Sequence, residues 1–171
     1  MEGYIDLLIP IIEFSIGLGG FSAVVSVFLH RNGDLAPPDL LRVMNLLFFA
    51  LGPAFMVFIA IGLLHFTDSP MPSFRYATGA LGLYISAVAS YAIIARNKLP
   101  VQQKAILRTS IFISMIAVSV VNAMLQFLAT LGFIDGVIYQ VFYAGLIIML
   151  AQGFVQFVRL IIARPITTTD T

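Results

Sequence analysis

Five long apolar stretches, separated by short polar connections, account for most of the chain. They cover residues 7–29, 43–64, 76–95, 106–133 and 137–162. A helix needs about 20 mostly apolar residues to cross a hydrocarbon core of roughly 30 Å, and each stretch is long enough. The connections contain turn and helix-start residues such as Pro37-Pro38-Asp39 and Asp135-Gly136. The pattern predicts an all-α membrane protein, a bundle of five transmembrane helices.

These helices are expected to form one transmembrane domain over residues 1–165, followed by a polar tail over residues 166–171. Almost every residue is needed for a crossing or a connection, so no separate soluble module fits in the chain. The connection between the fourth and fifth stretches is short, and four helices is therefore the main alternative count. Those two stretches together are far too long for one crossing, which favours five.

The basic residues are distributed unevenly among the connections. Of the nine Lys and Arg residues, Arg75 alone lies on the side of the second and fourth connections. The others flank the first connection, the third connection or the end of the fifth stretch. Short cytoplasmic loops carry an excess of Lys and Arg. We therefore predict that the amino terminus lies outside and the carboxyl terminus lies in the cytoplasm.

The composition agrees with a membrane location. Hydrophobic residues make up 60% of the chain and charged residues 10%, whereas a soluble domain is roughly 45–50% apolar and about 25% charged. The formal net charge of +1 favours no nucleic-acid partner. The first residues contain no Lys or Arg, so the start of a cleavable signal peptide is missing and the first helix is expected to be retained. Short connections are typical of the bacterial plasma membrane, which is the predicted location.

Several kinds of chemistry are disfavoured by the residues that the chain contains. Cysteine is absent, which excludes disulfides, thiolate metal sites and a cysteine nucleophile. His30 and His65 are predicted at opposite membrane faces, so they cannot hold one metal or one haem. No catalytic sequence motif occurs, and no lysine lies inside a predicted span. We expect no enzymatic activity, no metal site and no cofactor.

Glu13 is the one acidic residue inside a predicted span. An ionisable side chain in the hydrocarbon is costly, by about 2.5–3.5 kcal/mol for the most polar residues at a helix centre. Two interpretations stay open: a proton or ligand role, or a protonated or hydrogen-bonded packing lock. Pro10, Glu13, Gly17 and Gly20 share one face at helical spacing, which predicts that Glu13 faces protein.

Small residues also form stripes at which helices could pack closely. On the first helix, such a stripe lies almost opposite Glu13 and predicts a helix packed between the bundle and another subunit. The third helix carries a comparable stripe, which we interpret as structural. The predicted helix or subunit interface consists of Ser15, Gly19, Ser22, Ser26, Gly79, Gly82, Ser86 and Ser90.

The remaining polar residues inside the spans gather on a few helix faces. Ser119, Asn122, Gln126 and Thr130 follow one another at spacings of three and four, which places them on one stripe of the fourth helix. Such amides more often bond neighbouring helices than substrates. If residues of similar depth converge, they form a polar pocket. The candidate intramembrane polar site consists of Glu13, Tyr84, Asn122, Gln126 and Gln140.

The third connection is rich in basic residues, which could contact anionic lipid headgroups at about 1 kcal/mol per contact near the surface. The predicted contact residues are Arg96, Lys98, Lys104 and Arg108. Gly52-Pro53 interrupts the hydrogen-bond ladder of the second helix and predicts a kink near mid-membrane.

Three functions from different classes are compatible with these features. The favoured one is a non-catalytic subunit or scaffold of a larger membrane complex, bound to other membrane polypeptides or to copies of itself. The second is a small transporter or homo-oligomeric channel that uses Glu13 and the polar stripe of the fourth helix. The third is a membrane-embedded module that senses an apolar or aromatic ligand.

Overall fold

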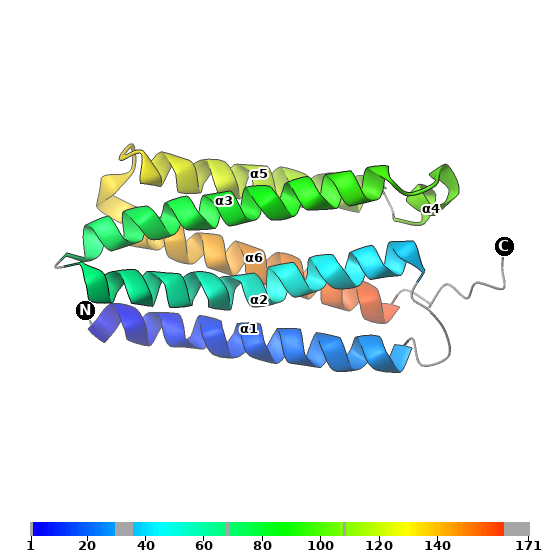
Figure 1. The fold of residues 1–171 in the computed structure, drawn as a ribbon, viewed down its shortest axis with the longest axis horizontal. Coiled ribbons are helices and arrows are strands. Elements are labelled where there is room, and N and C mark those ends of the chain that lie inside the picture. Colours follow the sequence, from blue (N-terminus) through cyan, green and yellow to red (C-terminus); the bar gives the residue numbers. More distant parts are fainter. Residues whose placement is uncertain (1, 30–35, 68, 108, 163–171) are drawn as a thin grey trace.

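The computed structural model describes residues 2–29, 36–67, 69–107 and 109–162. Helices dominate these residues, and no strand occurs among them (Figure 1). In chain order the elements are α1 (Glu2–Leu29), α2 (Pro37–Phe66), α3 (Pro70–Asn97), α4 (Val101–Ile106), α5 (Thr109–Thr130), the 3₁₀ turn η1 (Asp135–Val137) and α6 (Ile138–Ile162).

Five of these helices are long and apolar enough to cross a membrane: α1, α2, α3, α5 and α6, the last together with η1. The prediction of an all-α bundle with five such helices is confirmed, and the five helices suggest an integral, multi-pass membrane protein. The bounds differ from the sequence prediction. The first three long helices begin at Glu2, Pro37 and Pro70 rather than at 7, 43 and 76. The short helix α4 occupies the third connection, and the fourth long helix covers Thr109–Thr130 rather than 106–133.

The helix ends follow from local sequence. Pro37 and Pro38 stand at the start of α2, and Pro70 stands at the start of α3, where the missing N–H of proline costs no helical hydrogen bond. At the end of α5, Gly132 has a φ of 84°, a conformation that glycine adopts without strain. The Gly132 N–H donates to the Ala129 carbonyl and the Phe133 N–H donates to the Leu128 carbonyl. This is a Schellman motif, and it stops the helix before the predicted boundary.

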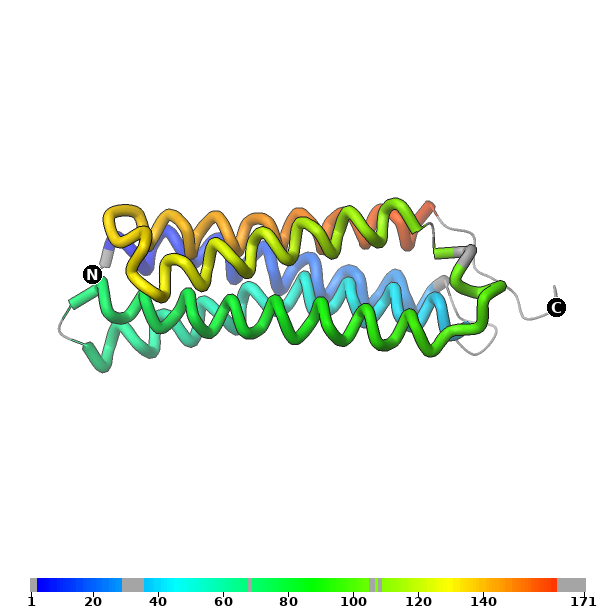
Figure 2. The backbone as a smooth tube through the Cα atoms, turned by 90° about the horizontal axis from the view of Figure 1, so that it is seen from above, coloured from blue at the N-terminus to red at the C-terminus, as the bar shows by residue number. Residues whose placement is uncertain are grey.

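Four helices form the body of the bundle, and the first packs against its side. Neighbouring contacts run from α2 to α3, from α3 to α5, from α5 to α6 and from α6 back to α2, while α3 also touches α6 across the centre. Helix α1 packs against α2 and α6 (Figure 2). It therefore has one face against the bundle and one face turned away from it.

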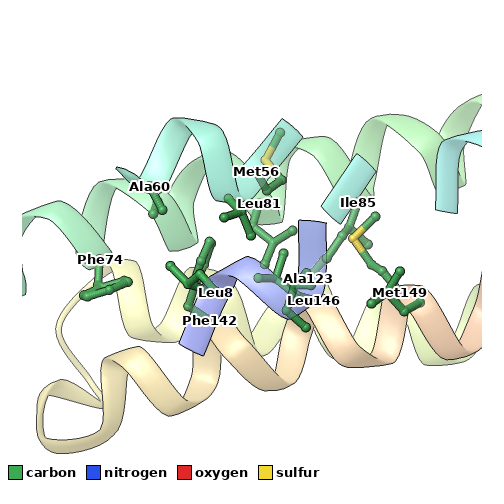
Figure 3. Packing of buried hydrophobic residues seen from close by; sticks show 14 of the residues in the cluster. Leu8, Met56, Ala60, Phe74, Leu81, Ile85, Ala123, Phe142, Leu146 and Met149 are labelled. Carbon is green, nitrogen blue, oxygen red and sulfur yellow. The ribbon is translucent and has the colours of Figure 1, made fainter. Parts of the chain in front are cut away.

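The centre of the bundle is filled by aliphatic and aromatic side chains. Leu81, Ile85, Phe142, Leu146 and Met149 pack there from α3 and α6, and Leu8 reaches the same cluster from α1 (Figure 3). Because lipid chains are as apolar as these residues, close van der Waals packing stabilises the bundle more than removal from water does.

Apart from Glu13 of α1, the described acidic and basic residues lie toward the two ends of the bundle. We call one end the basic end: here α2 begins and α3 and α6 end, and its described basic residues are Arg42, Arg96, Lys98, Lys104 and Arg159. At the far end, Arg75 of α3 forms an exposed ion pair with Asp135 of η1. Arg42 forms a buried ion pair with Asp39, with Nη1 and Oδ1 2.8 Å apart.

Candidate functional site

The most unusual polar residue of the structure is Glu13, which is exposed on the outer face of α1. It lies eleven residues after the start of the helix at Glu2, or about 16 Å along its axis. Its neighbours on this face are apolar: Phe14, Gly17 and Phe21 are all exposed. A membrane would surround this face with hydrocarbon, where a carboxyl group is costly.

Glu13 lies in a groove between α1 and α6, which we call the Glu13 groove. Its volume is about 550 Å³. It is lined by Pro10, Glu13, Phe14, Gly17, Leu18, Phe21 and Phe154. Gly17 leaves open space: a Cβ atom added there would meet no neighbouring atom within 4 Å, and the same holds at Gly20. The face is thus smooth enough for another backbone to approach closely.

The prediction that Glu13 faces protein is wrong within the chain, because the opposite face of α1 packs against the bundle. Ser15, Ser22 and Ser26 are buried there, and the Ser22 and Ser26 hydroxyls donate to the carbonyls of Leu18 and Ser22. Gly19 has no room for a side chain, since an added Cβ would lie 2.4 Å from Leu51 Cδ2. Because α1 lies at the side of the bundle, only one of its two opposite faces packs against α2 and α6, and this is the serine face.

Two candidate polar residues, Asn122 and Gln126, do come together, and they bond α5 to α6. The Asn122 amide donates to the Gly145 carbonyl at 3.1 Å. Gln126 Nε2 donates to the Val141 carbonyl at 2.9 Å and to Asn122 Oδ1 at 3.2 Å. Gly145, which the sequence analysis did not single out, makes this contact possible: an added Cβ would lie 2.3 Å from Gln126 Nε2.

The same helix pair is joined nearer the basic end by two glutamines of α6. Gln152 Nε2 donates to the Met115 carbonyl at 2.9 Å and to the Ser119 hydroxyl at 3.1 Å. Gln156 Nε2 lies 3.0 Å from the sulfur of Met115. We call this set the amide seam; it consists of Ser119, Asn122, Gln126, Gln152 and Gln156. Its donors are used to hold helices together, which leaves them poorly placed to coordinate a ligand.

The other two candidates of the predicted polar pocket lie elsewhere. Tyr84 donates its hydroxyl to the Phe48 carbonyl of α2 at 2.9 Å, close to the point where Pro53 interrupts the hydrogen-bond ladder. Its ring fills the space beside Gly52. Gln140 is exposed near the start of α6. The five candidates therefore do not form one pocket in this chain, because they lie on different faces of their helices.

The small-residue stripe of α3 is an internal helix contact over part of its length. Gly79 faces Thr130 and Gly82 faces the ring of Phe127, both from α5. The Thr130 hydroxyl also lies 3.0 Å from that of Thr78. The Ser86 hydroxyl donates within α3 to the Gly82 carbonyl, and Ser90 is exposed.

The basic third connection is partly tied to the bundle. Arg96 donates to the Thr109 hydroxyl at 2.9 Å, and its guanidinium lies 4.6 Å from the centre of the Phe112 ring. Lys98 is exposed, Lys104 is half-buried, and Arg108 lies outside the described residues.

Potential metal ligands do not cluster in the described part of the chain. No group of three His, Asp or Glu residues there is arranged to hold an ion. His65 is exposed and its Nδ1 lies 2.8 Å from the Ile61 carbonyl, whereas His30 lies outside the described residues.

Comparison with family models, curated proteins and solved structures finds no match to this chain. The function is therefore inferred from the geometry of α1 and of the amide seam.

Proposed function

We propose that this protein is a non-catalytic integral membrane subunit or scaffold, and that the Glu13 groove binds a transmembrane helix of another polypeptide. The observation that carries the proposal is an exposed carboxyl group on an otherwise apolar helix face.

The position of Glu13 makes its carboxyl group energetically costly in a membrane. A polar group in hydrocarbon is stabilised by a hydrogen-bonding partner, and polar residues in membrane spans usually face protein or water. The Tyr84 hydroxyl and the amide N–H groups of Asn122 and Gln126 already donate to neighbouring helices of the chain. A helix from outside the chain can supply a donor to Glu13 and at the same time cover the rings of Phe14 and Phe21.

The shape of the groove favours a helix as the partner. Gly17 lines the groove without a side chain, and Gly20 on the same face of α1 is equally open, which allows the close backbone approach typical of small-residue helix contacts. A complementary helix carries Lys, Arg or an amide residue at the depth of Glu13 and a bulky apolar residue opposite Gly17.

We further propose that the basic end lies in the cytoplasm, that α1 therefore begins outside, and that the membrane is a bacterial plasma membrane. The support is the charge distribution: Arg75 is the one Lys or Arg residue described at the far end, and it is paired with Asp135.

Purification in a gentle detergent, followed by mass spectrometry of the proteins that accompany the chain, tests the proposal. We expect at least one further membrane polypeptide, and we expect Glu13→Leu and Gly17→Ile to remove it. Gly62→Ile is the matched control, since Gly62 on α2 also has no atom within 4 Å of an added Cβ. This control is expected to keep the partner.

Three results would contradict the proposal or redirect it. A wild-type chain that is a stable lone monomer in native membranes would overturn it. Self-association that depends on Glu13 would identify a second copy as the partner. Flux through liposomes that Glu13→Gln alters would favour the transporter or channel instead.

A further inference from the structure

A second groove runs between α5 and α6, on a different pair of helices from the Glu13 groove. We call it the α5–α6 groove. Ile111, Met115 and Val118 of α5 and Ile148, Ala151 and Val155 of α6 form its walls. Its volume is about 390 Å³, within the range of roughly 300–1,000 Å³ that is usual for ligand sites. The lining residues span seven residue steps on each helix, which sets the length of the groove at about 10 Å along the bundle axis.

The α5–α6 groove presents hydrocarbon to its occupant, although two polar residues line it. The Ser114 hydroxyl donates to the Ser110 carbonyl of its own helix at 3.0 Å. Gln152 uses its amide N–H groups within the amide seam, on the Met115 carbonyl and the Ser119 hydroxyl. A polar ligand would find no available donor in the groove, whereas an aliphatic chain is compatible with every wall.

One end of the groove lies toward the basic end of the bundle, and we call this end its mouth. Ile111 is the third residue of α5, and Val155 lies four residues before Arg159, so the Arg159 backbone is about 6 Å further along the same side of α6. Arg159 donates to Gln156 at 3.1 Å, and Gln156 in turn contacts Met115 of the groove wall. A guanidinium is thus held near the mouth of an apolar groove.

The surrounding charge also favours an anion. Among the described residues of the basic end, Asp39 is the one acid, and it is buried against Arg42. Phosphate groups are recognised well by the fork of N–H donors of arginine. The mouth of the groove therefore complements a phosphate, and its interior complements an acyl chain.

We infer that the α5–α6 groove is a binding site for an anionic phospholipid, with one acyl chain between α5 and α6 and the headgroup phosphate at Arg159. This site is separate from the Glu13 groove and does not depend on the proposed partner helix. It also differs from general attraction of lipids to the basic third connection, because it requires both a cavity and one particular arginine.

Native mass spectrometry of the detergent-purified chain, titrated with phosphatidylglycerol or with phosphatidylcholine of identical acyl chains, tests the inference. We expect phosphatidylglycerol to bind more tightly and Arg159→Gln to weaken it about fivefold, the factor that corresponds to about 1 kcal/mol per basic contact. Arg159→Lys, which keeps the charge, should retain most of the binding. Ala151→Phe fills the groove and should abolish the tight site.

Two matched controls make the result decisive. Ala144→Phe places the same ring on the same side of α6 two turns away and outside the groove, and it should leave binding unchanged. Lys98→Gln removes a charge from the basic end at an exposed position and should have a much smaller effect than Arg159→Gln. The inference is overturned if Ala151→Phe binds like the wild type, if the two lipids bind equally, or if Lys98→Gln weakens binding as much as Arg159→Gln.

Discussion

The amide seam and the outer face of α1 both place polar groups inside a predicted hydrocarbon layer, but the seam amides are buried and the α1 carboxyl group is exposed. Asn122 and Gln126 are each 1% exposed, and they donate to backbone carbonyls of α6. Glu13 is exposed and sits in an open groove. The donor groups of the seam are used within one chain, although Gln126 Oε1 and Gln152 Oε1 have no partner there, whereas the described residues leave the Glu13 face uncovered. Buried amides thus indicate internal packing, whereas the exposed carboxyl group is the feature on which the proposed partner rests.

Alanine substitutions of a glycine in each region should give the largest difference in the free energy of unfolding. Gly145→Ala puts a methyl group into the space of Gln126 Nε2 and forces the seam apart. We expect it to lower the free energy of unfolding by about 1–3 kcal/mol, the usual cost of overpacking. The methyl group of Gly17→Ala meets no atom. This variant should leave the free energy of unfolding of the isolated chain unchanged or raise it slightly, because alanine favours helices. Unfolding in mixed micelles, followed by circular dichroism, measures both.

The contrast would fail if Gly145→Ala were as stable as the wild type, because the seam would then not be closely packed.

Polar-to-apolar substitutions should change the free energy of unfolding in opposite directions in the two regions. Gln126→Leu removes hydrogen bonds to Val141 and Asn122 and should destabilise the isolated chain by about 1 kcal/mol, at about 0.6 kcal/mol per bond. Glu13→Leu removes no described contact and should stabilise the isolated chain in lipid, while it abolishes partner binding. Steric-trap unfolding in lipid bicelles compares the two variants. Equal destabilisation by both would mean that Glu13 has a partner within the chain.

A last pair of substitutions should distinguish the two faces of α1 itself by their effect on the free energy of unfolding. Gly19→Ala is expected to cost about 0.5–1.5 kcal/mol, because the flexible side chain of Leu51 must leave its preferred rotamer. The adjacent Gly20→Ala has open space and should cost nothing. Thermal unfolding of the two variants, measured side by side, tests the inward orientation of the serine face. A larger loss for Gly20→Ala would show that α1 is rotated relative to the orientation described above.

Much of the fold followed from periodicity and length. Apolar stretches of sufficient length specified the five long helices, since each must satisfy its own backbone hydrogen bonds in a bilayer. The helix stop at Gly132 was missed because phenylalanine and isoleucine continue the apolar run beyond it. The short helix α4 was missed because six residues carry too little periodicity to predict a helix.

The candidate site was only partly predictable. The spacing of Asn122 and Gln126 correctly placed them on one stripe, but their acceptors are backbone carbonyls of Val141 and Gly145, and every residue has such a carbonyl. The role of Gly145 could not be predicted from the sequence either. A glycine in a membrane helix indicates that another helix can approach closely, but it does not specify which residue packs there.

The sequence by itself determined the number of long helices and, through the spacing of Pro10, Glu13 and Gly17 against Ser15, Gly19 and Ser22, the existence of two faces on α1. The tertiary structure alone decided which face is internal. Both faces have small residues and both suit a helix neighbour, so local physics does not distinguish them. The distinction arises from packing: Gly19 lies against Leu51 of α2 and Leu18 lies beside Gly153 of α6, so α1, at the side of the bundle, turns its serine face inward.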